Sequence, residues 1–321
     1  MIRGIILLIL SATFFGCNQD NKKVRLTLGH ALDTRHVVHI AMEHMAQRLE
    51  HYSNGSMEIV IYPGGQLGSE REMIELLQIG SLSMTKVSAS PLEGFVPEMK
   101  IFSIPYLMRD REHFWRVLNS ELGQSLLDKV KVARLKGMGY YDAGSRSFYT
   151  KDAPIRTPDD LTGKKIRVLN SPTAMATVKA LGGAATPIAF GELYAAIQQG
   201  VVDGAENNPP SYYLSRHYEI ARYYSLDEHT FVPDVILASL PVWNALTKQQ
   251  QEWFSKAMAD SVEFQKSLWQ TESDKALATV KAEGVEVIYP DKKAFQDKVI
   301  PFHATFDNSP IAKQIKIIKQ M

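Results

Sequence analysis

The sequence predicts an α/β protein of two domains, joined by several crossing segments and spanned by one long helix. Three observations support this prediction. The chain has 321 residues, and a single hydrophobic core stops growing at roughly 250–300 residues. Short apolar strands alternate with amphipathic helices, a pattern typical of sheets covered by helices. Finally, the run from Thr247 to Glu283 contains neither glycine nor proline.

Composition excludes several classes of protein. The 36 Lys+Arg and 35 Asp+Glu give a formal net charge of +1, which argues against a nucleic-acid partner because such proteins carry a basic excess. With one cysteine, an intramolecular disulfide and a Cys-rich metal site are both impossible. No apolar run reaches the 18 residues or so that a membrane-spanning helix needs.

The N-terminus predicts export and a lipid anchor. Arg3 precedes an apolar run of signal-peptide length. Gly16-Cys17 followed by polar residues resembles the bacterial lipoprotein cleavage box, with Phe14 in place of the usual leucine. We therefore expect a signal peptide at 1–16, lipidation of Cys17, and a tether at 17–23 that holds the protein at a membrane surface. The alternative is an ordinary signal peptide with a chance cysteine.

The first domain opens as strand, helix, strand, helix. Residues 24–28 alternate with period two, as a strand does. A helix follows, with an apolar stripe at helical spacing that comprises Val38, Ala41, Met45 and Leu49. A second strand covers 59–62. Ser69 and Glu72 then form a capping box for a helix that extends through Leu77.

The middle of the chain repeats this alternation and predicts a second, mostly parallel sheet that starts near residue 145. The expected elements are a strand at 135–141, a short helix capped by Thr157, a strand at 165–169, a helix from Ser171 to Gly182, a helix at 190–199 and a strand that begins at Val201.

The run at 247–283 determines how the domains connect. As one helix it would be ~55 Å long at about 1.5 Å per residue, longer than a small domain is wide. The alternative is two helices with an inconspicuous break. With one helix, domain I comprises 24–144 plus 233–270, and domain II comprises 145–232 plus 271–321.

Enzyme motifs are absent, and no cofactor is expected. Pro63-Gly64-Gly65 precedes a helix, but no Lys-Ser/Thr pair follows, so this is not a phosphate-binding P-loop. His36, His39, Glu43 and His44 are the best metal candidates. They fall on the helix face opposite the apolar stripe, where solvated side chains are expected, so we predict no metal site.

Two arginines indicate an anion site at a sheet edge. Arg146 follows strand 135–141 in a short loop, and Arg167 lies near the carboxyl end of its strand. Glu206-Asn207-Asn208 ends the next strand at the same edge, where ligands of open α/β sheets collect. Arginine presents a planar fork that matches a carboxylate. The alternative is that these arginines form structural salt bridges with Asp142 or Glu206.

The chain resembles the solute-binding proteins of TRAP transporters (tripartite ATP-independent periplasmic transporters). The similarity covers residues 24–290 and rests on the combination of Leu161–Val168 (LTGKKIRV) with 186–207 (TPIAFGELYAAIQQGVVDGAEN), Gly65–Gly68 and Ile104–Tyr106. It implies a hinged two-domain fold like that of periplasmic binding proteins. It also implies a receptor in the periplasm that delivers its ligand to separate permease subunits, and we expect that receptor to be a monomer.

The resemblance also implies site residues. Arg167 corresponds to the arginine that pairs with the ligand carboxylate, and Arg146 corresponds to a second arginine found in many members. Three residues of domain II are expected to add contacts: Asn207, Asn170 and Phe190. Four residues of domain I lie at loops that contact sugar hydroxyls: His30, Ser69, Glu70 and Ser88.

Residues 204–212 and 224–229 resemble the branch that binds hexuronates such as D-glucuronate or D-galacturonate. The alternatives are a receptor for a C4-dicarboxylate, sialic acid or another organic acid. A sugar-acid-processing enzyme such as a lyase is more remote, as is a sensor or ABC-type receptor.

Overall fold

The computed structural model describes residues 23–321. The expected signal peptide, the lipidation site Cys17 and most of the tether lie outside the described residues. Within 23–321, no helix has both the length and the apolar composition that crossing a membrane requires.

One sheet has the strand order β2-β1-β3-β10-β4. Its strands are β1 (Val24–Gly29), β2 (Met57–Tyr62), β3 (Met84–Ser88), β4 (Leu135–Tyr141) and β10 (Asp234–Ser239). β1 runs parallel to β2 and β3, whereas β10 lies antiparallel between β3 and β4. We call this half of the molecule domain I.

The other sheet has the order β11-β9-β5-β8-β6-β7 and forms domain II. Its strands are β5 (Ser145–Thr150), β6 (Lys165–Val168), β7 (Ala184–Pro187), β8 (Gly204–Asn207), β9 (Tyr223–Phe231) and β11 (Glu286–Ile288). β6 is parallel to β7 and β8, but β5 is antiparallel to β8 and β9. Because β11 is also parallel to β9, three of the five strand pairings are parallel, so the expectation of a mostly parallel second sheet is confirmed, although both sheets are mixed. The antiparallel pairings are made by β5 and β10, the strands that arrive from the other domain.

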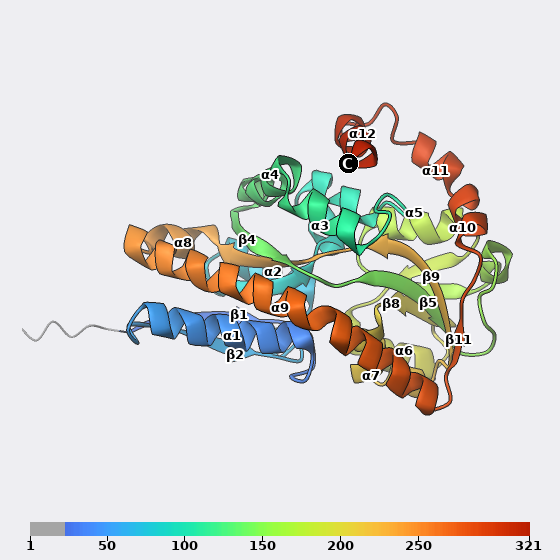
Figure 1. Cartoon of the computed structure of the whole chain (residues 1–321), viewed down its shortest axis with the longest axis horizontal. Coiled ribbons are helices and arrows are strands. Elements are labelled where there is room, and N and C mark those ends of the chain that lie inside the picture. Colours follow the sequence, from blue (N-terminus) through green and yellow to red (C-terminus); the bar gives the residue numbers. More distant parts are fainter. Residues whose placement is uncertain (1–22) are drawn as a thin grey trace, which may run out of the picture.

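Helices cover both sheets (Figure 1). The α-helices are α1 (Val37–Tyr52), α2 (Glu70–Gln78), α3 (Arg111–Asn119), α4 (Glu121–Lys129), α5 (Pro172–Ala180), α6 (Leu193–Gln198), α7 (Pro209–Leu214), α8 (Leu240–Ala245), α9 (Lys248–Ala282), α10 (Lys292–Lys298), α11 (Ile300–Ala304) and α12 (Ala312–Gln320). The 3-10 helices are η1 (Ser90–Gly94), η2 (Pro97–Ser103), η3 (Val130–Ala133), η4 (Pro158–Leu161), η5 (Phe190–Glu192) and η6 (His217–Glu219).

α9 is one continuous helix of 35 residues that extends along both domains (Figure 1). Thr247 and Gln250 form a capping box at its start, which satisfies backbone donors that a helix N-terminus leaves free. Its first half packs on α1 of domain I, where Ser261 donates to the Ala41 carbonyl at 2.6 Å. Its second half packs on α7 and places Val280 in the core of domain II. The predicted long helix is therefore confirmed.

Two short segments connect the sheets beside α9. One joins β4 to β5 and the other joins β9 to β10. The fully buried side chain of Gln265 on α9 holds the first segment, because its amide accepts from the Asp142 N–H and donates to the Asp142 carbonyl, both at 2.8 Å. Gly144 follows with φ +58°, and a Cβ there would lie 2.8 Å from the indole nitrogen of Trp269.

The C-terminal segment departs from the expected boundaries. The sequence predicts that residues 271–321 belong to domain II, but Phe306, Ile311, Ile315 and Ile318 pack in the core of domain I. In addition, His113 on α3 contacts the carbonyl of Ile318 at 3.0 Å. In Figure 1, α12 accordingly lies over α3. The amphipathic pattern of α12 predicts a buried face, but not which domain buries it.

Three local expectations are also corrected. Arg146 lies on strand β5 and not in a loop, because β5 pairs with β8 and β9 directly after the crossing segment. His36 and His39 are buried and not solvated, since α9 and the β1–α1 loop cover that face of α1. Residues 201–203 form a turn, and β8 begins at Gly204.

Candidate functional site

Two adjoining cavities lie between the domains and share Ala31, Glu70, Leu169 and Phe190. The larger has a volume of about 420 Å³ and is lined by the loop before α2, by Arg167 and Asn170, and by residues 187–192. The smaller has about 30 Å³ and is lined by residues that include Lys86, Ser88, Arg146, Asn207 and Asp234. We call them together the interdomain cavity. Its size suits a small polar ligand.

Arg167 presents an unsatisfied donor beside this cavity. Its side chain lies on β6 and is only 1% exposed. Nε donates to the carbonyl of Ile188 at 2.8 Å, but the buried Nη1 has no hydrogen-bond partner among the described residues. Burial lowers the pKa of the guanidinium. A buried, unpaired cation is costly, and an anion bound in the cavity would offset that cost.

Arg146 is compensated by protein groups. Its guanidinium pairs with the carboxylate of Glu206, and Nη1 donates to Oδ1 of Asn207 at 3.0 Å. Both carboxylate oxygens of Glu206 thus face one guanidinium. Within residues 23–321, the salt bridge that the sequence left open as an alternative is present for Arg146 and absent for Arg167, so Arg167 carries the positive charge that no carboxylate there compensates.

Buried acidic and basic groups extend this pair. His229 lies 3.8 Å from Glu206 and 2.8 Å from Asp227. Although burial raises the pKa of Glu206, Arg146 and His229 outweigh it and lower that pKa to about 2. Burial likewise opposes the charge on His229, but Asp227 and Glu206 raise its pKa to about 9. Two positive groups, Arg146 and His229, and two negative groups, Glu206 and Asp227, therefore form a network behind the cavity whose formal charges cancel.

The other domain II candidates border the cavity. Asn170 and Phe190 line the larger part, and the Phe190 ring centroid lies 5.9 Å from the Arg167 guanidinium carbon. The Asn207 oxygen already accepts from Arg146 and from the N–H of Asn208. Its amide nitrogen makes no hydrogen bond within residues 23–321 and remains available as a donor.

The domain I candidates divide into two groups. Glu70 and Ser88 lie together in the cavity wall, where the Ser88 N–H donates to Glu70 Oε1 at 3.0 Å. Ser69 also lines the cavity, but its hydroxyl is engaged with Glu72 in the capping box of α2.

His30 lies outside the cavity lining. One ring nitrogen contacts His39 at 2.9 Å and the other accepts from the N–H of Leu32 at 3.1 Å. Burial lowers the pKa of His30 to about 3, which keeps the ring neutral. Its expected contact with ligand remains a prediction, and the structure gives the ring a role in holding the start of α1 against β1.

Sequence reasoning missed Lys86 and Asp234. Lys86 Nζ lies 3.3 Å from Glu70 and 3.2 Å from Asp234, and all three side chains border the smaller cavity. A lysine on a short strand between Met84 and Val87 was the available signal. Asp234 carries no local signal, because only the antiparallel pairing of β10 with β3 brings it there.

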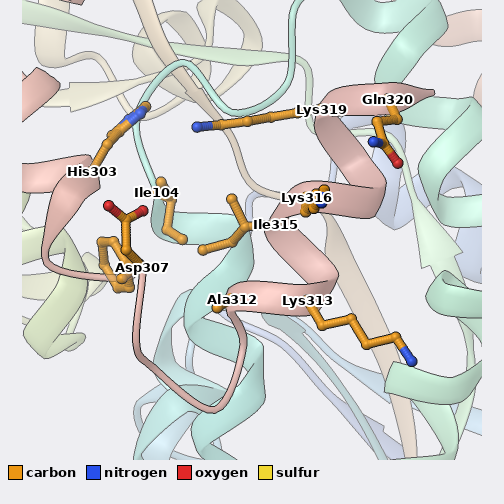
Figure 2. A pocket seen from close by; sticks show the side chains of 10 residues that line it. Ile104, His303, Asp307, Ala312, Lys313, Ile315, Lys316, Lys319 and Gln320 are labelled. Atoms are coloured by element: carbon orange, nitrogen blue, oxygen red, sulfur yellow. The ribbon is translucent and has the colours of Figure 1, made fainter.

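A larger cavity, of about 600 Å³, lies beside the C-terminal helix α12 (Figure 2). Ile104 and Ile315 form its apolar floor, and Lys313, Lys316 and Lys319 extend from α12 in different directions. These lysines are exposed to solvent, so no buried group there needs a ligand. Arg167 makes the interdomain cavity the better candidate.

The chain matches the family of bacterial extracellular solute-binding proteins, family 7, over residues 28–309. An uncharacterized protein of Salmonella typhimurium, YiiZ, is 41% identical to this chain. The match covers 84% of this chain and 83% of that protein.

Solved structures of solute-binding proteins from TRAP transporters also match the chain. A TRAP periplasmic solute-binding protein from Xanthobacter autotrophicus, solved with bound β-D-galacturonate, is 36% identical with a TM-score of 0.88; the match covers 92% of this chain and 99% of that protein. One from Pseudomonas putida F1, solved with bound D-glucuronate, is 35% identical with a TM-score of 0.87 and coverages of 91% and 97%.

Proposed function

The chain belongs to family 7 of the bacterial extracellular solute-binding proteins, the receptors of TRAP transporters, and we propose that its interdomain cavity captures a hexuronate. The ligand carboxylate would accept hydrogen bonds from Arg167, and its hydroxyls would contact the domain I wall. The unpaired Nη1 of Arg167 is the observation that carries this proposal. The family consists of receptors, and we propose that this chain likewise binds its ligand without converting it.

Structural neighbours support the choice of ligand. Proteins that share 35% and 36% identity with this chain over more than nine-tenths of its length were solved with D-glucuronate and β-D-galacturonate. The neutral Arg146–Glu206 pair and Asn207 lie next to Arg167 and offer both donors and acceptors. A sugar hydroxyl can donate and accept at once, so it suits such a mixed surface.

The cavity has one wall from domain I and one from domain II, so ligand binding can be coupled to the relative position of the two domains. A ligand that touches both walls binds the closed arrangement better than an open one, and that difference in affinity drives closure. We propose that the closed protein then docks on the permease subunits of its transporter. We also propose that the chain acts in the periplasm as a monomer held at a membrane by lipidated Cys17.

Calorimetric titration of D-glucuronate and D-galacturonate tests the site. Wild type should bind at least one of them, and Arg167→Ala should weaken that binding roughly a hundredfold. A hydrogen bond to a charged group contributes about 1.5–3 kcal/mol, and each 1.4 kcal/mol is about tenfold in Kd. D-glucose, which lacks the carboxylate, should bind wild type at least as weakly as the uronates bind the variant.

Arg156→Ala is the matched control. Arg156 is an exposed arginine of domain II whose guanidinium contacts Glu286 at 2.8 Å, and it does not line the cavity. It should leave uronate affinity unchanged. Wild-type affinity in a folded Arg167→Ala protein would refute the carboxylate clamp, and uronate turnover by the wild type would refute the receptor function.

A further inference from the structure

The domain I wall of the cavity contains three buried charges. Lys86 on β3 contacts Oε1 of Glu70 at 3.3 Å and Oδ1 of Asp234 at 3.2 Å. The three side chains are 3%, 12% and 6% exposed, in that order. Two carboxylates share one ammonium, so this cluster has a formal charge of −1. We call Glu70, Lys86 and Asp234 the acidic wall.

Hydrogen bonds fix the orientation of both carboxylates. Glu70 Oε1 accepts from Lys86 and from the backbone N–H of Ser88. Asp234 Oδ1 accepts from Lys86 and, at 3.2 Å, from the hydroxyl of Ser88. Lys86 and Ser88 thus engage one oxygen of each carboxylate. The second oxygens, Glu70 Oε2 and Asp234 Oδ2, accept no hydrogen bond from the part of the chain that the structure describes.

The two free carboxylate oxygens of this wall can only accept hydrogen bonds. An ionised carboxylate has no proton to donate. Burial acts first to lower the pKa of Lys86, but Asp234 and Glu70 raise it overall, which keeps the ammonium charged. Burial, together with repulsion by Glu70, raises the pKa of Asp234, as expected where negative charge exceeds positive. A ligand group at this wall must therefore donate hydrogen bonds and must not add negative charge.

The opposite requirement holds at Arg167, whose guanidinium only donates. The cavity thus joins the donor-only guanidinium of domain II to two free carboxylate oxygens of domain I that can only accept. A molecule that satisfies both has a carboxylate at one end and hydroxyls at the other.

We propose that the acidic wall determines ligand specificity by accepting hydroxyl hydrogens and rejecting a second carboxylate. This inference rests on the proposed function and narrows it. The receptor takes polyhydroxy acids with a single negative charge, and it discriminates against dianions such as aldarates and C4-dicarboxylates. The attractive element is the pair of free carboxylate oxygens, and the repulsive element is their uncompensated charge.

The test compares D-glucuronate with D-glucarate, the dianion in which a second carboxylate replaces the aldehyde carbon. Calorimetry gives the ratio of the two Kd values for wild type, Glu70→Gln and Asp234→Asn. Wild type should prefer glucuronate by about a hundredfold or more. Each variant removes one negative charge while Lys86 keeps one carboxylate partner. Each should weaken glucuronate binding about tenfold, as expected for one hydrogen bond to a charged group, and should narrow the ratio at least tenfold.

Glu252→Gln is the control for a change of net charge alone. Glu252 is exposed on α9 and lines neither part of the cavity. This substitution should leave the ratio of the glucarate and glucuronate Kd values within about twofold of the wild-type ratio. Melting temperatures without ligand show whether each variant is folded.

Two results would overturn the inference while leaving the receptor function intact. One is a wild type that binds glucarate as tightly as glucuronate, which is decisive even if a variant fails to fold. The other is folded Glu70→Gln and Asp234→Asn variants whose ratio of Kd values matches that of Glu252→Gln. A wild type that binds no uronate refutes the proposed function instead. A wild type that binds a dicarboxylate and no uronate refutes both the proposed function and the specificity inference.

Discussion

At the scale of single residues, two arginines on the strands that flank β8 have different roles because of one glutamate on β8. Arg146 and Arg167 are both buried, but Glu206 neutralises only Arg146. The uncompensated guanidinium of Arg167 has a free-energy cost in the unliganded protein, because burial removes its hydration. The binding site therefore lowers the free energy of unfolding of the unliganded protein.

This difference predicts the effect of removing the charge. Arg167→Met keeps most of the side-chain volume and eliminates the unpaired cation. Without ligand it should be as stable as wild type or more stable, by up to about 2 kcal/mol, since apolar replacement of buried charges is often stabilising. Urea denaturation of both proteins measures the difference in free energy of unfolding. A loss of more than about 1 kcal/mol would show that Arg167 supports the fold.

At the scale of elements, a contact between η1 and the start of α5 links the two domains. Glu93 on η1 of domain I accepts from the Ser171 hydroxyl at 2.5 Å, and from the hydroxyl and N–H of Thr173 at 2.7 and 3.1 Å. Ser171 caps α5, so the carboxylate lies at the positive end of that helix. This contact forms only when the domains lie as close as they do here.

Weakening this contact should therefore weaken binding of every ligand by the same factor. Glu93→Gln and Thr173→Val each remove one partner, and each should raise the Kd of a bound uronate about five- to tenfold through a less stable closed state. In the double mutant the effects should not add, with a coupling of about 1 kcal/mol. Titration of the four proteins with two ligands measures this. Strictly additive effects, or a change in selectivity between the ligands, would contradict it.

At the scale of the whole molecule, buried ionisable groups set the pH dependence of stability. Burial lowers the pKa of His30, His36 and His217 to about 3. Below pH 6.5 the unfolded chain binds protons at these positions and the folded chain does not, so stability falls as pH falls. Glu206, with its pKa lowered to about 2, adds to this loss below about pH 4.5, the ordinary value for glutamate.

His229 acts in the opposite direction. Its pKa is raised to about 9 by Asp227 and Glu206, against the effect of burial. The folded protein therefore keeps a proton that the unfolded chain releases near pH 6.5, and stability falls as pH rises from about 6.5 to 9. Together these shifts predict maximal stability near pH 6.5–7.

Melting temperatures from pH 4 to 9 test this prediction. Wild type should show a maximum near neutrality with a decline on both sides. His229→Gln should lose most of the alkaline decline, while the acid decline remains. An alkaline decline that is equal in both proteins would mean that His229 does not hold its proton to pH 9.

The sequence alone determined the elements whose signals are local. Thr247 and Gln250 cap α9, the absence of glycine and proline keeps it continuous, and the strand around Arg167 follows from its alternation. These features depend on neighbours within a few residues, and so they are readable from the chain. The resemblance to TRAP receptors rests on the same kind of local motif.

Only the tertiary structure decided which charges are compensated. Arg146 meets Glu206 across 60 residues, and Lys86 meets Asp234 across 148, because antiparallel strands that return from the other domain pair beside them. α12 likewise packs on a distant part of the chain, since Ile315 and Ile318 are buried in the core of domain I. Free energies of burial and ion pairing depend on distance in space, and sequence separation does not report that distance. The chain therefore showed that an anion site exists, and the packing of the two domains decided which arginine remains free for the anion.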